Sequence, residues 1–182
     1  RLFAEGSFNA AFVPSYSSEL TKGKNKAKNF ANDVFNFLML GLLILVIFVE
    51  ILMPGFVFLI APGFYEDQSK LELTTLLTRI TFPFLLFISL ASFFSAILNS
   101  HNKFGVAAAA PIILNFILIL IIFLEKNSDD NLVIYLSYGV SIAGLIQLIF
   151  VYFFAKKYFF PKLNLKFKIT KKIKIFFNKF LP

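Results

Sequence analysis

The sequence predicts an all-α protein, a polytopic bundle of membrane-spanning helices. The chain has 182 residues, of which 58% are apolar and 27 are Phe, whereas soluble domains reach roughly 45–50% apolar residues even with Gly counted. The chain is also basic, with 18 Lys and Arg against 10 Asp and Glu, and its net charge is +8. High apolar content combined with basic charge is typical of an inner-membrane protein whose charges lie in the loops.

Four apolar stretches are long enough to cross a bilayer, which takes about 17–25 residues of helix. The first is interrupted by Glu50 and then by Pro54, and the second carries Arg79 and Pro83 near its start. Together they occupy residues 34–155, and we expect one transmembrane helix in each of four ranges: about 34–60, 73–98, 105–124 and 132–155.

Residues 1–17 are predicted to form the end of a truncated helix. The apolar stretch over 2–13 is too short to span a membrane and runs into Pro14. A secretory signal peptide is a poor interpretation, because the stretch has no Met, no basic region before it and no continuous apolar segment. We therefore expect the chain to be a fragment of a longer protein.

Lysines gather in alternate connections between the predicted spans. The segment 18–33, predicted as a basic loop, holds four lysines, the turn 99–104 holds one, and residues 156–182 hold nine. The other two connections hold only Lys70 and Lys126. The positive-inside rule assigns the fourteen lysines to the cytoplasm, so both ends of 34–155 should face the cytoplasm. Lysines beside spans indicate topology and contact with anionic membrane lipids, so we expect no nucleic-acid partner.

The basic tail 156–182 has two interpretations. Ile169, Ile173, Phe176 and Phe180 recur at spacings of 4, 3 and 4, with lysines on the remaining circumference. That pattern predicts an amphipathic helix on the membrane surface. Alternatively, the tail is a cytoplasmic linker that leads to the next span, and both interpretations can hold together.

Catalytic chemistry is not indicated. The sequence shows no phosphate-binding glycine loop, no metal-binding histidine motif and no nucleophile with a base, so we expect no catalytic residue, metal site or cofactor. His101, the one histidine, is interpreted as a polar turn residue beside Lys103. The acidic pairs 66–67 and 129–130 lie in predicted outer loops, where carboxylates are solvated.

Charges and amides inside apolar stretches are more informative, because burying them in hydrocarbon is costly. Glu50 is interpreted as an interfacial carboxylate near the outer leaflet, with a functional role as the alternative, and Arg79 as a cation that reaches the outer headgroups. Arg1 and Glu5 share one helix face at a spacing of four and could pair beside a polar cavity. Amides such as Asn36 and Gln147 are expected to form hydrogen bonds between helices.

Several strings resemble the MurJ (MviN) family of lipid II flippases, in the same order and at the same spacing. They are RLFAEGSF at 1–8, AFVP at 11–14, APGF at 61–64, RITFP at 79–83 and AILNS at 96–100. The resemblance covers essentially the whole chain. Two positions depart from the family pattern: Ala107 stands where many members have Pro, and Glu50 occupies a usually apolar position.

The resemblance implies the N-lobe of a two-lobed transporter similar to the multidrug and toxin extrusion proteins, with the end of one helix and four complete spans. It implies a monomer of the bacterial inner membrane, in which alternating access moves lipid II across the bilayer. Cations of a central cavity would hold the diphosphate, and Arg1 and Glu5 are the motif residues expected near it. Two alternatives stay open: a flippase for another undecaprenyl-linked glycan, and a non-transporting membrane scaffold.

Overall fold

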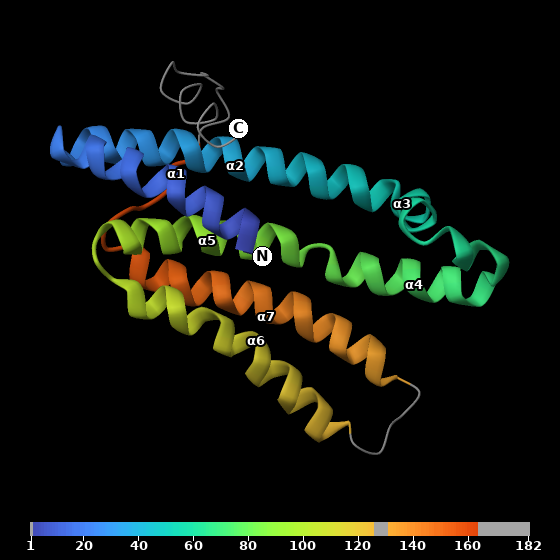
Figure 1. Ribbon diagram of the computed structural model, residues 1–182. Coiled ribbons are helices and arrows are strands. Elements are labelled where there is room, and N and C mark those ends of the chain that lie inside the picture. Colours follow the sequence, from blue (N-terminus) through green and yellow to red (C-terminus); the bar gives the residue numbers. More distant parts are fainter. Residues whose placement is uncertain (1, 126–130, 164–182) are drawn as a thin grey trace. The chain divides into compact units, whose positions relative to one another are not determined.

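The computed structural model describes residues 2–125 and 131–163, except for the side chains of 2–7 and 65. Helices joined by short turns make up most of this part of the chain, which contains no strand (Figure 1). This confirms the predicted all-α fold. The elements are α1 (Leu2–Thr21), α2 (Lys24–Ile51), α3 (Met53–Ile60), the 3-10 helix η1 (Pro62–Glu66), α4 (Gln68–Thr81), α5 (Phe84–Ser100), α6 (Phe104–Leu124) and α7 (Leu132–Ala155).

Four helical segments are long and apolar enough to cross a membrane: Lys24–Ile51, Gln68–Ser100, Phe104–Leu124 and Leu132–Ala155. The second of them combines α4 and α5. Because a bilayer leaves backbone groups no water to bond, a run of such helices is the arrangement that an integral membrane protein needs.

The prediction of a basic loop over residues 18–33 is wrong. Helix α1 continues to Thr21 and α2 already begins at Lys24, so only two residues separate them. Gly23 makes the reversal possible, because its φ of +124° is one that side-chain-bearing residues rarely adopt. Lys and Ala are good helix formers, so α2 starts ten residues before the apolar stretch at Val34 that marked the predicted span.

The first predicted span is broken between Ile51 and Met53, where α2 ends and α3 begins. Pro54 lies in the first turn of α3, where its missing N–H would have no partner in the helix anyway. The break is held by an apolar cluster of Val49, Met53 and Val57, with Phe56, Leu71 and Phe82 packed against it. Helix α3 is thereby anchored on α4.

The second predicted span is broken before Pro83, between α4 and α5. Pro83 lacks the N–H that would bond the Arg79 carbonyl, and the end of α4 at Thr81 leaves its last carbonyls, including that of Ile80, to find donors outside the helix. The carbonyl of Ile80 accepts a hydrogen bond from the hydroxyl of Ser141 on α7. A neighbouring helix therefore satisfies the backbone at this break.

Replacing Ser141 with alanine should lower the free energy of unfolding in detergent by about 1 kcal/mol, because the Ile80 carbonyl loses this donor. The matched control is Ser137→Ala on the same helix. Among the described residues, the Ser137 hydroxyl bonds only the Val133 carbonyl of its own helix, at 2.9 Å, so its loss should cost less. Equal losses for the two variants, measured by denaturant unfolding, would contradict this account of the break.

Helix α4 begins at Gln68, five residues before the predicted span, because Asp67 caps it. The Asp67 side chain accepts hydrogen bonds from the Ser69 hydroxyl at 2.7 Å and the Lys70 N–H at 3.2 Å. These bonds and the ammonium of Lys70 at 3.0 Å hold the pKa of Asp67 well below its usual range. The cap satisfies a backbone donor that the helix itself leaves unpaired.

The chain forms two compact units. Unit 1 comprises residues 1–41, 89–110 and 148–182, and unit 2 comprises 42–88 and 111–147. The core of unit 1 is aromatic: the ring of Phe93 is fully buried and meets the rings of five other aromatic residues, Phe8, Phe12, Phe35, Phe94 and Phe159. In unit 2, α7 packs closely on α5 at Gly144 and on α6 at Gly139.

Candidate functional site

Three segments that are far apart in the sequence meet at one end of unit 1: the α1–α2 turn, the α5–α6 turn and the end of α7 (Figure 1). The Tyr16 hydroxyl on α1 lies 3.3 Å from Nε2 of His101. The His101 ring also stacks on Tyr158, with centroids 4.2 Å apart and planes at 19°. We call this region the lysine end.

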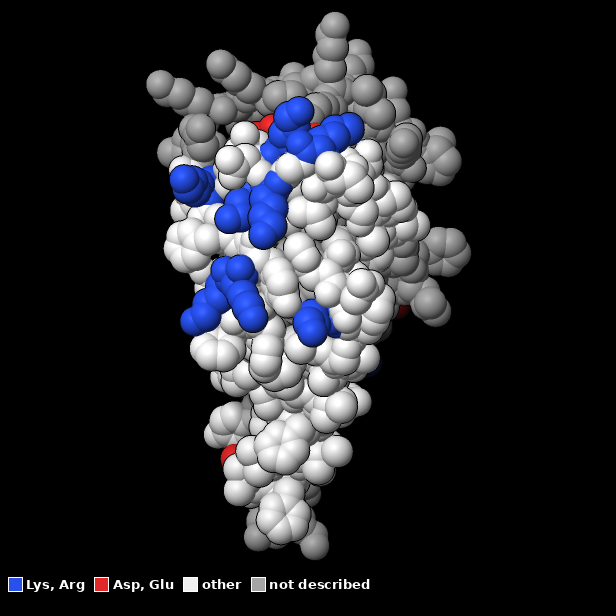
Figure 2. Space-filling view, turned by 90° about the vertical axis from the view of Figure 1, so that its left-hand side faces the viewer, with Lys and Arg blue, Asp and Glu red and all other residues white. Residues whose placement is uncertain are grey.

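The lysine end carries a concentration of exposed ammonium groups, and Figure 2 looks onto it. Among the described residues of unit 1, the exposed lysines are Lys22, Lys24, Lys26, Lys28, Lys103, Lys156, Lys157 and Lys162. These are lysines of the same three segments that the charge pattern assigned to one side of the membrane. Their summed charge attracts anions.

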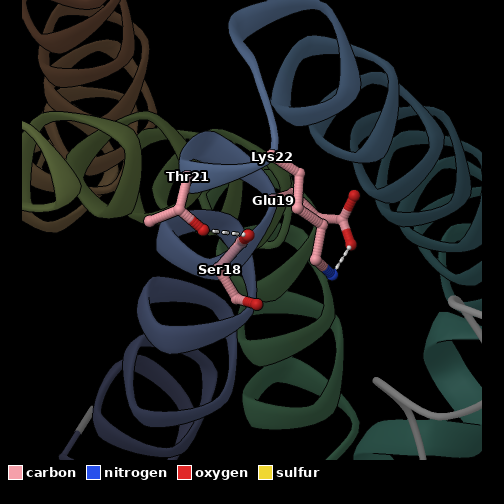
Figure 3. Close-up of polar contacts among 4 residues, drawn as sticks. All are labelled: Ser18, Glu19, Thr21 and Lys22. Atoms are coloured by element: carbon pink, nitrogen blue, oxygen red, sulfur yellow. Dashed lines mark hydrogen bonds and ion pairs between the residues drawn. The ribbon is translucent and has the colours of Figure 1, made fainter.

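One of these lysines is neutralised locally. The Lys22 ammonium lies 2.9 Å from Oε1 of Glu19, whose side chain is only 9% exposed, and the Thr21 hydroxyl donates to the Ser18 carbonyl at 2.8 Å (Figure 3). Lys22 thus offsets a buried carboxylate at the end of α1. In the described part of the chain, Lys24, Lys26 and Lys28 form no ion pair, so the start of α2 carries uncompensated positive charge.

His101 is more than the polar turn residue that the sequence suggested. Its ring is half-buried between two tyrosines. Burial and the positive charge of Lys24 both lower the pKa of His101, with burial the larger cause. Only the assembled helix ends bring Tyr16 and Tyr158 to the histidine, which is why its spacing in the sequence did not reveal them.

The folded protein should lose stability as the pH falls below 6.5, the ordinary pKa of histidine, because burial lowers the folded-state pKa of His101. A folded-state pKa below 6.5 means that the unfolded chain binds more protons in this pH range. The stability that the neutral His101 ring contributes is fully present above pH 6.5, and it is lost as the pH falls through the folded-state pKa. His101→Phe keeps a ring against Tyr158 and should flatten this part of the profile, measured by thermal unfolding in detergent. The same slope in both proteins would contradict the assignment.

A pocket of about 520 Å³ opens beside the start of α2. Four residues on one face of α2 line it together with three from the segment after α7: Asn25, Lys28, Asn29, Asn32, Phe159, Phe160 and Lys162. The backbone N–H of Lys162 donates to Oδ1 of Asn32 at 2.7 Å, and the Asn36 amide donates to the Lys162 carbonyl at 3.0 Å. We call this the α2 pocket. It combines cationic, amide and aromatic walls.

Unit 2 brings Glu50 and Arg79 into one electrostatic environment. Glu50 is the penultimate residue of α2, and Arg79 lies in the last turn of α4. The Arg79 charge acts on the Glu50 carboxylate, and Oε1 of Glu50 is buried with no hydrogen-bond partner among the described residues. The sequence treated the two residues separately, because no pattern indicates a relation between positions 29 apart.

Close by in unit 2 lies a second, smaller pocket of about 170 Å³, lined by residues of α3 and α4 and of the segments beside them. Its walls are Val49, Met53, Phe56, Val57, Ile60, Ala61, Thr74, Thr78 and Phe82. Apart from two threonines these residues are apolar. The pocket therefore suits hydrocarbon rather than a charged headgroup.

The polar residues expected at membrane depth behave differently from one another. Asn36 forms a long-range hydrogen bond to the Lys162 carbonyl, which lies in the segment after α7 and not on another helix, so this bond is not the interhelical one that was predicted. Gln147 is fully buried, and within the described residues both polar atoms of its side chain lack a partner. The prediction of an interhelical hydrogen bond is therefore wrong for Gln147 as well. An unpaired buried amide costs roughly 1–3 kcal/mol.

The two motif residues expected near a cavity are not described in full. Arg1 lies outside the described residues, and Glu5 lies on α1 with a side chain that the structure does not describe. Their pairing stays a prediction, as does the amphipathic helix over 164–182. Across residues 2–125 and 131–163, no three His, Asp or Glu side chains lie where they could together hold a metal ion.

A family model described as lipid II flippase MurJ matches residues 1–182. The chain belongs to this family. Curated MurJ relatives agree: proteins named "Probable lipid II flippase MurJ" are 39% identical over 157 residues in Rickettsia prowazekii and 43% identical over 157 residues in Rhizobium tropici. A third, from Buchnera aphidicola subsp. Schizaphis graminum, is 36% identical over 172 residues. The resemblance to MurJ proteins found in the sequence is confirmed.

The chain is short beside these MurJ relatives. The alignments cover 86%, 84% and 91% of this chain but only 31%, 30% and 33% of the Rickettsia, Rhizobium and Buchnera proteins. The chain therefore spans about a third of the MurJ length. With its four candidate spans, it is an integral membrane protein of the MurJ family.

Proposed function

We propose that this chain is part of a lipid II flippase, which moves the lipid-linked peptidoglycan precursor from the inner to the outer leaflet of the cytoplasmic membrane for cell-wall synthesis. The observation that carries the proposal is the family match over residues 1–182. The chain spans only part of its relatives, so the activity is proposed for the longer protein that contains it.

The proposed mechanism is alternating access, in which a lobe moves as a rigid body around the substrate. Arg1, with Glu5 on the same helix face, would contribute to a cationic cavity that holds the diphosphate of lipid II. Helices broken at membrane depth, such as α2–α3 and α4–α5, are common in transporters. No step of this mechanism requires a catalytic residue, a metal or a cofactor, and the transporter is proposed to act as a monomer.

Complementation of a conditional flippase depletion tests the proposal. The full-length gene should restore lipid II exposure at the outer leaflet. A well-expressed, correctly inserted protein that restores no exposure would contradict the proposal. Restored export of another undecaprenyl-linked glycan would favour that substrate instead, and no effect on either would favour a scaffold.

We further propose that the lysine end faces the cytoplasm and that Asp67 faces the outside. The chain contains no Cys, so single cysteines can be introduced without background labelling from other cysteines of the chain. Lys24→Cys and Lys168→Cys should resist a membrane-impermeant maleimide in intact cells, while Asp67→Cys and Asp129→Cys should react. All four should react after permeabilisation, which controls for access, and the reverse pattern in intact cells would contradict the orientation.

A further inference from the structure

The α2 pocket at the lysine end presents the chemistry of an anion site. Lys28 and Lys162 line it, and in the described part of the chain neither ammonium forms an ion pair. The Asn25 and Asn29 side chains lie on the same face of α2 and add amide donors. We propose that the α2 pocket binds the phosphate group of an anionic phospholipid.

The position of the pocket on α2 strengthens its preference for an anion. Asn25 lies in the first turn of a helix of 28 residues. In that turn the N–H groups of Lys26 and Ala27 bond to the Gly23 carbonyl, whereas the N–H of Asn25 has no backbone partner among the described residues. The N–H of Asn25 and the helix dipole place partial positive charge at this end of α2, near Lys28.

The opposite wall of the pocket is held in place before any ligand binds. Both backbone groups of Lys162 are hydrogen-bonded to asparagines of α2, at 2.7 Å and 3.0 Å. Phe159 is only 2% exposed, and its ring packs against Phe93 with centroids 5.8 Å apart. A ligand therefore meets a preformed site, which lowers the entropy cost of binding.

The surroundings favour a lipid-borne phosphate over a free one. Asn32 lies two residues before the apolar stretch of α2, and α7 ends at Ala155, four residues before Phe159. The pocket is thus at the polar end of two candidate spans, at the level of lipid headgroups. Phe160 lines the pocket yet is 67% exposed, which suits contact with the glycerol and acyl part of a lipid.

The proposal depends on the chain lying in a membrane and not on the flippase activity, so its test needs no transport assay. The purified whole chain in neutral detergent is titrated with phosphatidylglycerol or with phosphatidylcholine of the same acyl chains, and bound lipid is counted by native mass spectrometry. We expect the wild type to retain phosphatidylglycerol at least about tenfold more tightly.

Two double variants that remove the same charge distinguish a specific lipid site from general electrostatic attraction of anionic lipid by the lysine end. Lys28→Gln with Lys162→Gln should weaken phosphatidylglycerol binding about tenfold. The control, Lys26→Gln with Lys157→Gln, removes two exposed lysines that do not line the pocket and should change affinity by less than about threefold. Asn29→Asp, which keeps the side-chain shape and adds one negative charge in the pocket, should weaken binding more than Lys26→Gln alone.

Three results would overturn the assignment. Equal losses in the pocket and control variants would show diffuse attraction by the lysine end. Equal retention of phosphatidylglycerol and phosphatidylcholine would show that the anionic headgroup is not recognised. Displacement of the lipid by millimolar inorganic phosphate would show that a soluble anion is the ligand. Thermal unfolding of each variant in phosphatidylcholine confirms that the comparison is between folded proteins.

Discussion

Phe93→Ala should lower the free energy of unfolding by about 3–5 kcal/mol, the range measured for large-to-small changes in well-packed cores. Phe93 is fully buried at the centre of unit 1. Its ring lies 5.2 Å from that of Phe12 and 5.4 Å from that of Phe94, both edge-on, so the variant loses aromatic contacts as well as buried area.

Phe123→Ala is the matched control, since Phe123 is 74% exposed on α6 and meets lipid or detergent in both the folded and the unfolded chain. Its effect should stay below about 1 kcal/mol. Denaturant unfolding in micelles, followed by circular dichroism, gives both values. A Phe93 variant no less stable than the Phe123 variant would contradict an aromatic core in unit 1.

Gly144→Ala should cost about 1–3 kcal/mol, because α5 and α7 approach each other too closely for a methyl group. A Cβ at position 144 would lie 2.5 Å from Cδ2 and 3.1 Å from Cε2 of the Phe84 ring, and 3.3 Å from Cβ of Phe87. The ring is rigid and the Cβ of Phe87 moves only with its backbone, so relief requires the two helices to separate. The helix propensity that alanine adds offsets part of the cost.

Gly139→Ala on the same helix is the control. There the one short contact, at 2.3 Å, is with Cδ1 of Ile121, the far end of a flexible side chain that can rotate away, and the next contacts are at 3.6 Å and 3.7 Å. Its unfolding free energy should stay within about 1 kcal/mol of the wild type. Similar stability of the two alanine variants would contradict the close α5–α7 packing.

The spans and the family could be predicted from the sequence because both depend on local patterns. A stretch such as 105–124 is apolar enough to identify a candidate span by itself, and the structure has α6 over nearly the same residues, Phe104–Leu124. The motifs at 1–14, 61–64 and 79–100 identify MurJ by order and spacing, which the family match confirms.

The helix boundaries could not be predicted as well, because hydropathy reports where a helix meets lipid and not where its backbone begins. Helix α2 includes three lysines that precede its apolar stretch, and α4 starts at the Asp67 cap. Proline positions did not predict the breaks by themselves, because Pro54 and Pro83 lie beside helix breaks whereas Pro14 and Pro111 lie inside α1 and α6. Nor did they indicate which partner satisfies the backbone before Pro83, since Ser141 lies 61 residues from Ile80.

The candidate sites needed the assembled structure for the same reason. Lysine counts placed the basic segments on one side, yet the pairing of Lys162 with Asn32, 130 residues away, is what forms the α2 pocket. Likewise, nothing in the sequence related Glu50 to Arg79 or His101 to Tyr158.

Residue composition and order alone thus establish an all-helical membrane protein, its span regions, its family and the segregation of its charge, because the bilayer imposes those properties on each segment separately. Folding alone decides which polar groups of distant helices meet. Such contacts depend on how helices pack and where they break, and a few ångströms of displacement would create or remove them.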